Sequence, residues 1–424
     1  MNNSVSQELL KFLQKSPTAF HAVAQMKDEL LKAHFTEIKE NERWKIERGG
    51  HYFVTRNDSS LIAFTIPENG IDKMHILTSH SDSPTFKIKE NPEIEVEKHY
   101  VKLNVEKYGG MLCAPWFDRP LSVAGRIIIK NTTNRQFTSK LVNIDRDLVM
   151  IPNLAIHMNR EINNGYTYNA QKDLLPIYSC GSPKGTFMEQ IAEAAGVEKE
   201  EILGHDLFLY NRQEGSVWGA SKEFISSGRL DDLQCAFASL QGFLFGEKKD
   251  CMAVHCVLDN EEVGSGTKQG AASTFLFDTL IRIHEVLGYD GEDYRVHLAD
   301  SFMISADNAH AVHPNYTEKA DPTNRPYLNE GIVLKFNANQ KYCTDAVSAA
   351  MFRDLCKRAD VPVQTFTNRS DMAGGSTLGN ISNTQVALNT VDIGLPQLAM
   401  HSPYETAGVK DTEYLVRAAK EFFC

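Results

Sequence analysis

The chain has 424 residues, of which 42% are hydrophobic, and its 55 acidic and 44 basic residues give a formal net charge of -11. A chain of this length can bury a large core, and the usual domain size of roughly 100–200 residues predicts two or three domains. The acidic balance argues against nucleic acid or an anionic membrane as a partner, because both require a basic surface.

The first residues, MNNSVSQELLKFLQ, lack the basic and then apolar segments of an export signal. No apolar run approaches the ~18 residues of a membrane span. The eight cysteines are scattered and form no CxxC pair, as expected for reduced thiols. We therefore expect a soluble, cytoplasmic protein.

The first 90 residues read as helices followed by strands. Apolar positions recur at helical spacing over 5–15 and 18–33, and Thr18 offers a start signal for the second helix. Strand-like segments follow at 51–57, 60–67 and 73–84. The last of them ends in the polar turn SHSDSP.

From about residue 91 the pattern changes to apolar and polar residues in alternation. Segments 93–110, 122–131 and 137–144 have a period of two and are bounded by glycine or Asn-Thr turns. This pattern predicts antiparallel strands with one solvent-exposed face. We expect an inserted domain over 91–226, so that residues 1–90 and 227–424 form one discontinuous domain.

After residue 226, predicted helices and strands follow one another with continuous apolar strands. Helices are predicted at 230–246, 271–288, 345–359 and 410–423, and strands at 251–259, 301–307, 361–368 and 384–391. This order predicts an α/β fold with a largely parallel central sheet that helices cover on both faces.

Function in open α/β sheets collects at the carboxyl ends of the strands. The ionisable residues at those ends, with two at the start of a helix, are His80, Asp82, Asp231, Asp232, Asp259, Glu261, Glu262, Asp307 and His401. Two histidines and a surplus of carboxylates, without cysteine, fit two divalent cations. Each element alone has an ordinary structural explanation, such as a solvated turn or a helix start, but their joint placement favours a metal centre.

The spacing of His80 and Asp82 also predicts a contact between their side chains. Asp82 is placed to accept a hydrogen bond from the ring N–H of His80 that faces away from the metal. Such a bond fixes the tautomer and orientation of a histidine ligand.

These residues stand in motifs that resemble one family. SHSDSP, GRLDDL, LDNEEVGS, SADNAHAVHPNY and LAMHSPYE occur in the order and form of the M18 metallopeptidases, and the chain is similar to aspartyl aminopeptidases. SPTAFHAV and IPNLAIHMNREINNG extend the resemblance over nearly the whole length. The resemblance implies a catalytic domain with the zinc-peptidase (phosphorylase/hydrolase-like) fold and a dimerisation domain at 91–226.

The resemblance also implies a centre of two divalent metals, zinc first, with cobalt or manganese as alternatives. His80 and Asp307 would bind one metal, Glu262 and His401 the other, and Asp231 would bridge them. Asp232 stands where the family usually has asparagine, so either aspartate could bridge, and the motif favours Asp231. Glu261 corresponds to the general base that takes a proton from the attacking water.

The resemblance also implies that other residues bind the substrate or take part in oligomer assembly. His157 corresponds to a histidine that reaches the active site of a neighbouring subunit, and the family assembles dimers into a tetrahedral dodecamer. Lys335 matches a lysine near the pocket for the substrate side chain. Gly374 and Gly375 lie in a segment similar to the lining of that pocket, and Gly374 replaces the family's usual cysteine.

The leading hypothesis is therefore an aminopeptidase that removes N-terminal residues, with acidic Asp or Glu preferred, from peptides with a free N-terminus. A preference for neutral or hydrophobic residues, or deacylation of N-acyl amino acids, are the enzymatic alternatives. A non-enzymatic assembly protein is disfavoured, because the base and every implied ligand are present.

Overall fold

The computed structural model describes residues 2–130, 137–181, 183–248 and 251–423. The chain divides into two compact units. The first comprises Met1–Asp82, Gly215–Met400 and Glu405–Cys424, and the second comprises Ser83–Glu214 and His401–Tyr404. The limits predicted from the sequence, 90 and 226, differ from these, and no sequence pattern indicated that His401–Tyr404 groups with the second unit.

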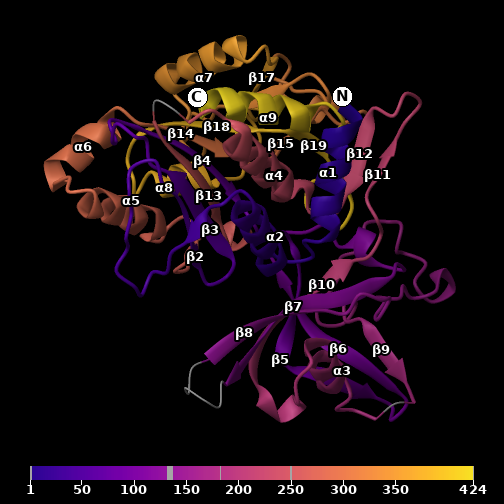
Figure 1. Cartoon of the computed structure of the whole chain (residues 1–424). Coiled ribbons are helices and arrows are strands. Elements are labelled where there is room, and N and C mark those ends of the chain that lie inside the picture. The colour runs from indigo at the N-terminus through magenta and orange to yellow at the C-terminus, as the bar shows by residue number, and fades with distance from the viewer. Residues whose placement is uncertain (1, 131–136, 182, 249–250, 424) are drawn as a thin grey trace. The chain divides into compact units, whose positions relative to one another are not determined.

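A nine-stranded sheet forms the centre of the first unit (Figure 1). Its order is β1 (Thr36–Glu37), β2 (His51–Arg56), β3 (Ser60–Thr65), β13 (Met252–Leu258), β4 (Met74–His80), β14 (Phe302–Ala306), β18 (Asn389–Gly394), β16 (Ile332–Lys335) and β17 (Val363–Phe366). The four strands in the middle, β13, β4, β14 and β18, run parallel. Antiparallel pairs join β2 to β3, β3 to β13 and β18 to β16. The prediction of a largely parallel sheet is confirmed.

Helices cover both faces of this sheet, as its buried strands require. One face packs on α1 (Asn2–Gln14), α2 (Ala19–Lys32), α4 (Leu230–Phe245), α7 (Ala346–Arg358) and α9 (Asp411–Phe422), and the other on α5 (Phe275–Val286), α6 (Gly291–Ala299) and α8 (Leu378–Ser382). Neighbouring residues of one strand supply both cores, since Leu77 of β4 lies in the first and Ile76 in the second.

Some predicted elements differ from the structure. The strand predicted at 384–391 begins only at Asn389, because 384–388 form a turn that buries Val386. Thr18 does precede α2 in an extended conformation, but its hydroxyl lies 2.8 Å from the His21 ring nitrogen Nδ1 and makes no capping bond to the backbone.

A smaller sheet also belongs to the first unit. It is ordered β11 (Ser216–Trp218), β12 (Phe224–Ser227), β20 (Glu405–Gly408), β19 (Pro396–Leu398) and β15 (Ala309–His310). β12 pairs with β20, so residues just before 227 are held by a strand from near the C-terminus. The alternation of helix and strand did not predict this sheet, because its strands have only two to four residues.

The second unit is built on a six-stranded antiparallel sheet, as the period of two predicted. Its order is β8 (Phe137–Asn143), β7 (Leu121–Lys130), β10 (Ile202–Asn211), β5 (Thr85–Val96), β6 (Tyr100–Tyr108) and β9 (Ile177–Cys180), with helix α3 (Phe187–Ala195). Its core includes Phe86, Trp116, Phe187 and Leu209.

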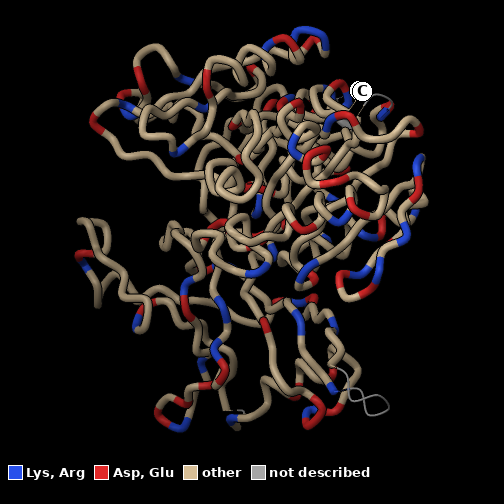
Figure 2. The backbone as a smooth tube through the Cα atoms, turned by 90° about the vertical axis from the view of Figure 1, so that its left-hand side faces the viewer, with Lys and Arg blue, Asp and Glu red and all other residues tan. Residues whose placement is uncertain are grey.

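Acidic and basic residues are interspersed along the backbone of both units (Figure 2). Within the described residues, no helix is long and apolar enough to cross a membrane.

Candidate metal centre

The site begins where two parallel neighbours end together. His80 closes β4, and in the ladder it pairs with Leu258, which closes β13. The chain then leaves β13 through Asn260, whose φ of 62° is left-handed, into the short turn Glu261–Val263. This sharp exit places both glutamates at the carboxyl edge of the sheet, beside His80.

The Asp82 carboxylate ties these two strand ends together. Its two oxygens accept hydrogen bonds from the backbone N–H groups of Glu261 and Glu262, at 3.1 and 3.2 Å. Asp82 is 4% exposed, so these bonds are shielded from competing water. The side chains of the two glutamates are thereby positioned by the residue two places after His80.

The two ring nitrogens of His80 face different partners. Nδ1 lies 3.1 Å from the Asp82 carbonyl oxygen and 3.3 Å from its carboxylate Oδ1. Nε2 lies 3.4 Å from Asp231 Oδ1 and 3.8 Å from Asp307 Oδ1. A histidine oriented on one side by a carboxylate or carbonyl and facing carboxylates on the other has the arrangement of a metal ligand.

The start of α4 supplies two further carboxylates. The peptide bond between Asp231 and Asp232 is cis, and both residues have non-helical backbone angles. The Asp231 N–H donates to the Glu405 carboxylate at 3.0 Å, and Asp232 Oδ2 accepts from the His80 N–H at 3.1 Å. Glu405 was missed as a positioning group, although it stands in the motif LAMHSPYE.

Possible ligand atoms form two overlapping groups. Those of His80, Asp231 and Glu262 lie within 4.8 Å of one another, as do those of Asp231, Asp232 and Asp307. Asp231 is common to both groups, which is the position a bridging carboxylate would take. Oxygen and imidazole donors without thiolates suit divalent cations such as zinc, so these residues fit the metal centre that the sequence predicts.

The shifted pKa values of the buried acids and of His80 also favour a metal centre. Burial raises the pKa of Glu262 well above its usual value, and Asp231 adds to the rise. Burial also raises the pKa of Glu261 to about 8, with Asp307, Asp82 and Asp231 acting in the same direction against the opposing effect of His80. Burial alone would lower the pKa of His80, but Asp231, Asp307 and Asp82 raise it well above 6.5. Crowded buried acids of this kind ionise together only when a cation compensates their charge.

Lys335 lies beside Asp307, and its part in a substrate pocket stays a prediction. It ends β16, is 3% exposed, and its Nζ donates to the Asn308 carbonyl oxygen at 2.8 Å. The same Nζ lies 3.7 Å from Asp307 Oδ2. No pattern in the sequence indicated this contact.

The predicted glycines lie in a segment without regular structure. A Cβ on Gly374 would meet the Asn368 amide at 1.9 Å, whereas the space beside Gly375 is open. Their part in a substrate pocket stays a prediction.

His157 and His401 are described within the second unit. His157 lies on the exposed turn Ile156–Met158. His401 has a φ of 67°, and its carbonyl oxygen accepts from the Leu112 N–H at 3.1 Å. Their relation to the metal centre stays a prediction.

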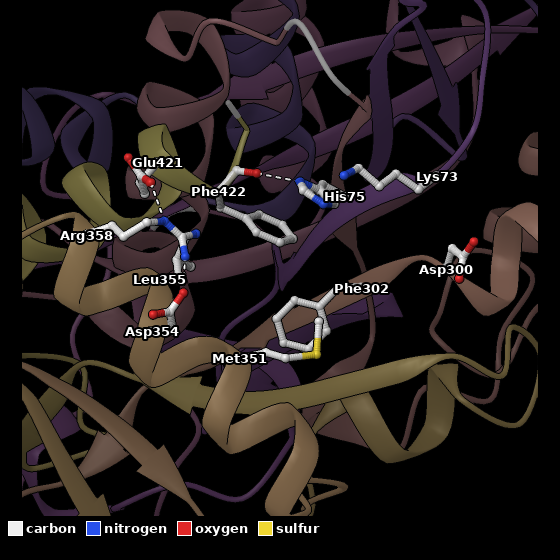
Figure 3. A pocket seen from close by; sticks show the side chains of 10 residues that line it. All are labelled: Lys73, His75, Asp300, Phe302, Met351, Asp354, Leu355, Arg358, Glu421 and Phe422. Carbon is white, nitrogen blue, oxygen red and sulfur yellow. Dashed lines mark hydrogen bonds and ion pairs between the residues drawn. The ribbon is translucent and has the colours of Figure 1, made fainter.

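A separate cavity of about 490 Å³ opens at the amino ends of β4 and β14 (Figure 3). Three of its charged groups are engaged with one another, since Arg358 pairs with Asp354 and Glu421. The His75 ring is bonded through Nδ1 to the Phe422 carbonyl oxygen at 2.6 Å. The cavity therefore lacks the convergent carboxylates of the metal centre.

Comparison with known proteins places this chain in a family. The family model described as "Aminopeptidase I zinc metalloprotease (M18)" matches residues 12–423. A "Probable M18 family aminopeptidase 2" of Clostridium novyi is 48% identical over 431 residues, covering 100% of both chains. The chain belongs to the M18 family of zinc aminopeptidases.

Solved structures of M18 relatives share the fold. Ape4, solved by cryo-EM in its complex with Nbr1, has a TM-score of 0.96 and 34% identity, covering 100% of this chain and 86% of that one. The mApe1 dodecamer of S. cerevisiae has a TM-score of 0.87 and 28% identity, covering 99% and 96%. As an M18 member, the protein is a metalloexopeptidase of the aminopeptidase type.

Proposed function

We propose that this M18 enzyme hydrolyses the N-terminal peptide bond of substrates with a free α-amine at a two-metal centre, with Glu261 as the general base. The observation that carries the proposal is the pair of overlapping ligand groups that share Asp231 and adjoin Glu261. His80 and Asp307 would hold one cation, Glu262 and His401 the other, and Asp231 would bridge them. The cations would supply Lewis acidity to the scissile carbonyl and the attacking water.

Glu261 is suited to moving the proton. Burial and the neighbouring acids raise its pKa in the metal-free protein, and a carboxylate with a raised pKa is a stronger base than an exposed one. Its backbone is fixed by the bond to Asp82, so its carboxylate can accept the proton of the attacking water. It would then donate that proton to the leaving amine nitrogen as the C–N bond breaks.

Asp82 acts in this proposal by orienting other groups. It holds the Nδ1 side of His80 and the N–H groups of both glutamates. A single carboxylate thus sets the direction of one ligand, the base and the next ligand. We assign it to positioning within the catalytic centre.

We also propose that the enzyme works as a homo-oligomer, a dodecamer built from dimers, in which His157 enters the site of a neighbouring subunit. His157 is flanked by the exposed apolar side chains of Leu154, Ile156 and Met158, which are 55%, 48% and 70% exposed. Exposed apolar residues gathered in one segment mark an interaction surface. The related mApe1 of S. cerevisiae is itself a dodecamer.

A preference for N-terminal Asp or Glu rests on the resemblance to aspartyl aminopeptidases. Lys335, the residue expected to read an acidic side chain, is buried with its Nζ engaged. We keep acidic substrates as the first choice for assay and neutral or hydrophobic ones as the alternative. The cysteines in the described residues are free thiols, which supports a reducing compartment such as the cytoplasm.

The test is an assay of the zinc-loaded protein, repeated with cobalt and manganese, on paired substrates. Each peptide beginning with Asp, Glu, Ala or Leu is offered with a free amine and with an N-acetyl group. We expect turnover of the free peptides alone. Cleavage of the acyl group with no release of free N-terminal residues would instead identify a deacylase, and inactivity on every substrate with zinc bound would favour an assembly protein.

A further inference from the structure

The peptide group that joins Leu230 to Asp231 is held by two buried side chains. Its carbonyl oxygen, on Leu230, accepts a hydrogen bond from Asn308 Nδ2 at 3.1 Å. Its N–H, on Asp231, donates to Glu405 Oε2 at 3.0 Å. Both polar atoms of this peptide group are therefore bonded immediately before the residue that the two ligand groups share.

These bonds are enclosed and their direction is fixed by chemistry. Leu230 is 0% exposed, Glu405 1%, Asn308 2% and Asp231 3%. A backbone carbonyl oxygen can only accept a hydrogen bond and an N–H can only donate one. The Asn308 side chain must therefore turn its nitrogen toward Leu230, and Glu405 must present an oxygen to Asp231.

Asn308 stands on backbone that is bonded on both sides. It lies between β14 and β15. Before it, the Asp307 N–H donates to the Ile393 carbonyl oxygen at 3.1 Å. After it, the Ala309 N–H donates to the Leu395 carbonyl oxygen at 2.8 Å. The short segment that carries the predicted ligand Asp307 thus also holds the peptide group of another ligand.

Glu405 is anchored by a strand pair. It is the first residue of β20, and in the ladder it pairs with Ser227, the last residue of β12. From Ser227 the chain reaches Asp231 in four residues. The Glu405 carboxylate therefore closes the turn that leads from β12 into α4.

The bonds from Asn308 and Glu405 use no atom that could bind a metal in either ligand group. They join backbone atoms of Leu230 and Asp231 to two side chains that lie outside both groups. The contact can therefore form whether or not a cation is bound. It leaves the Asp231 carboxylate available to the metals.

We propose that Asn308 and Glu405 are positioning residues that fix the direction of the Asp231 side chain before a metal binds. This inference rests on the proposed two-metal function, and it deepens that proposal by naming the groups that pre-organise the shared ligand. A ligand that is already ordered loses less freedom on binding, so it binds the metal more tightly. The ordinary structural alternative is that the two side chains only satisfy a buried peptide group.

The test compares E405M, E405Q and the control S301A in the full chain. E405M and E405Q both remove the charge, but only E405Q keeps an oxygen that can accept from the Asp231 N–H. Ser301 is 1% exposed, and its Oγ accepts from the Met74 N–H at 2.8 Å, at the end of β4 away from His80. S301A therefore removes an equally buried acceptor from a different backbone N–H.

Zinc affinity is measured against a competing chelator, and the geometry of the site by the visible absorption spectrum of the cobalt-loaded protein. We expect E405M to lower zinc affinity by roughly 10–100-fold, the usual effect of removing a group that orients a ligand, and to alter the cobalt spectrum. E405Q should recover most of the affinity. N308L, which removes the donor to Leu230, should resemble E405M.

S301A should lower the midpoint of urea unfolding but keep the zinc affinity and cobalt spectrum of the wild type. Equal losses of affinity in E405M and E405Q would assign the effect to charge and overturn the proposal. An E405M protein that is less stable but binds zinc and cobalt as S301A does would also overturn it, since the bond would then be structural only.

A measurement on the wild type covers the case in which the variants do not fold. Hydrogen exchange of chelator-treated protein is resolved to single amides by mass spectrometry with electron-transfer fragmentation. The Asp231 amide should be protected as strongly as the amides of the buried strand β13, and fast exchange there without zinc would overturn the proposal. If the wild type binds zinc but cleaves no peptide, the proposed function fails, whereas zinc affinity and hydrogen exchange still decide the role of Asn308 and Glu405.

Discussion

The free energy of unfolding of the metal-free protein should decrease as the pH rises toward 8. The cause is the set of buried acids at the centre. The pKa of Glu261 is raised by burial from 4.5 to about 8, and burial also raises those of Glu262 and Asp232. The folded metal-free protein then holds more protons on these acids than the unfolded chain does between these pH values, so the stability that they contribute is present at low pH and is lost as they ionise.

The magnitude follows from the pKa of Glu261. A difference of one pKa unit is worth about 1.36 kcal/mol. The full shift of Glu261 alone corresponds to roughly 5 kcal/mol, of which roughly 2 kcal/mol falls between pH 6.5 and pH 8. Bound cations should remove this penalty, because they stabilise the ionised acids.

Titrating groups outside the centre must be separated from this effect. Burial raises the pKa of Asp411 to about 7, which also lowers stability with rising pH. Burial lowers the pKa of His255 to about 3 and of His21 to about 4, so both reduce stability as the pH falls below 6.5. These contributions occur with and without metal, so the difference between the two forms isolates the centre.

The assay is urea unfolding, followed by circular dichroism at pH values from 6.5 to 8, on chelator-treated and zinc-loaded protein. Metal-free E261Q is the matched variant, and its stability should fall less steeply than that of the metal-free wild type. The reasoning is refuted if the stability gap between zinc-loaded and metal-free protein does not widen with pH. It is also refuted if E261Q and the wild type have the same slope.

Three further variants probe other parts of the structure. D82N should lower zinc affinity or kcat by roughly 10–100-fold, because Asp82 orients His80 and both glutamates; wild-type values in a metal titration and a kinetic assay would remove it from this role. H157F should keep its fold and zinc but lose most activity, and mixing it with subunits whose own metal site is broken should restore turnover; no recovery in mixed oligomers would argue against a shared site. F243A removes a fully buried ring that packs on Phe35 and Phe423, so urea unfolding should find it destabilised by about 3–5 kcal/mol; a change below about 1 kcal/mol would mean that the core refills the cavity.

The parallel centre of the fold could be predicted because its strands are buried on both faces. β13 and β14 are apolar along their whole length apart from single polar residues, and polar residues follow each directly. Since parallel strands end at one edge, the acids after them could be grouped from the sequence alone. His80, Glu262 and Asp307 were grouped by this reasoning, and Asp231 was added to them from the start of a helix.

One missed element, helix α6, lacks an apolar period. Helix α6 buries only Tyr294, and its only strong local signal is the capping box formed by Asp290 and Asp293. The apolar run at 384–391 indicated a strand, yet its first half packs as a turn around Val386.

The contact between Lys335 and Asp307 depends on strand order. β16 and β14 both neighbour β18, and the lysine reaches across it at Gly394. The periodicity of a sequence indicates the length and burial of a strand but not its neighbours, so this contact required the folded chain.

Whether Glu261 transfers a proton and does not bind metal can be tested by the zinc content and turnover of E261Q, measured on the same preparation. Glu261 is assigned to proton transfer and the other groups to metal binding, so the variant should keep two zinc ions per subunit and its oligomeric state. Its kcat on free-amine peptides should fall by at least about 10²–10⁴-fold, the usual contribution of a general base. Undiminished turnover would contradict the assignment, and so would loss of a zinc ion, which would make Glu261 a ligand.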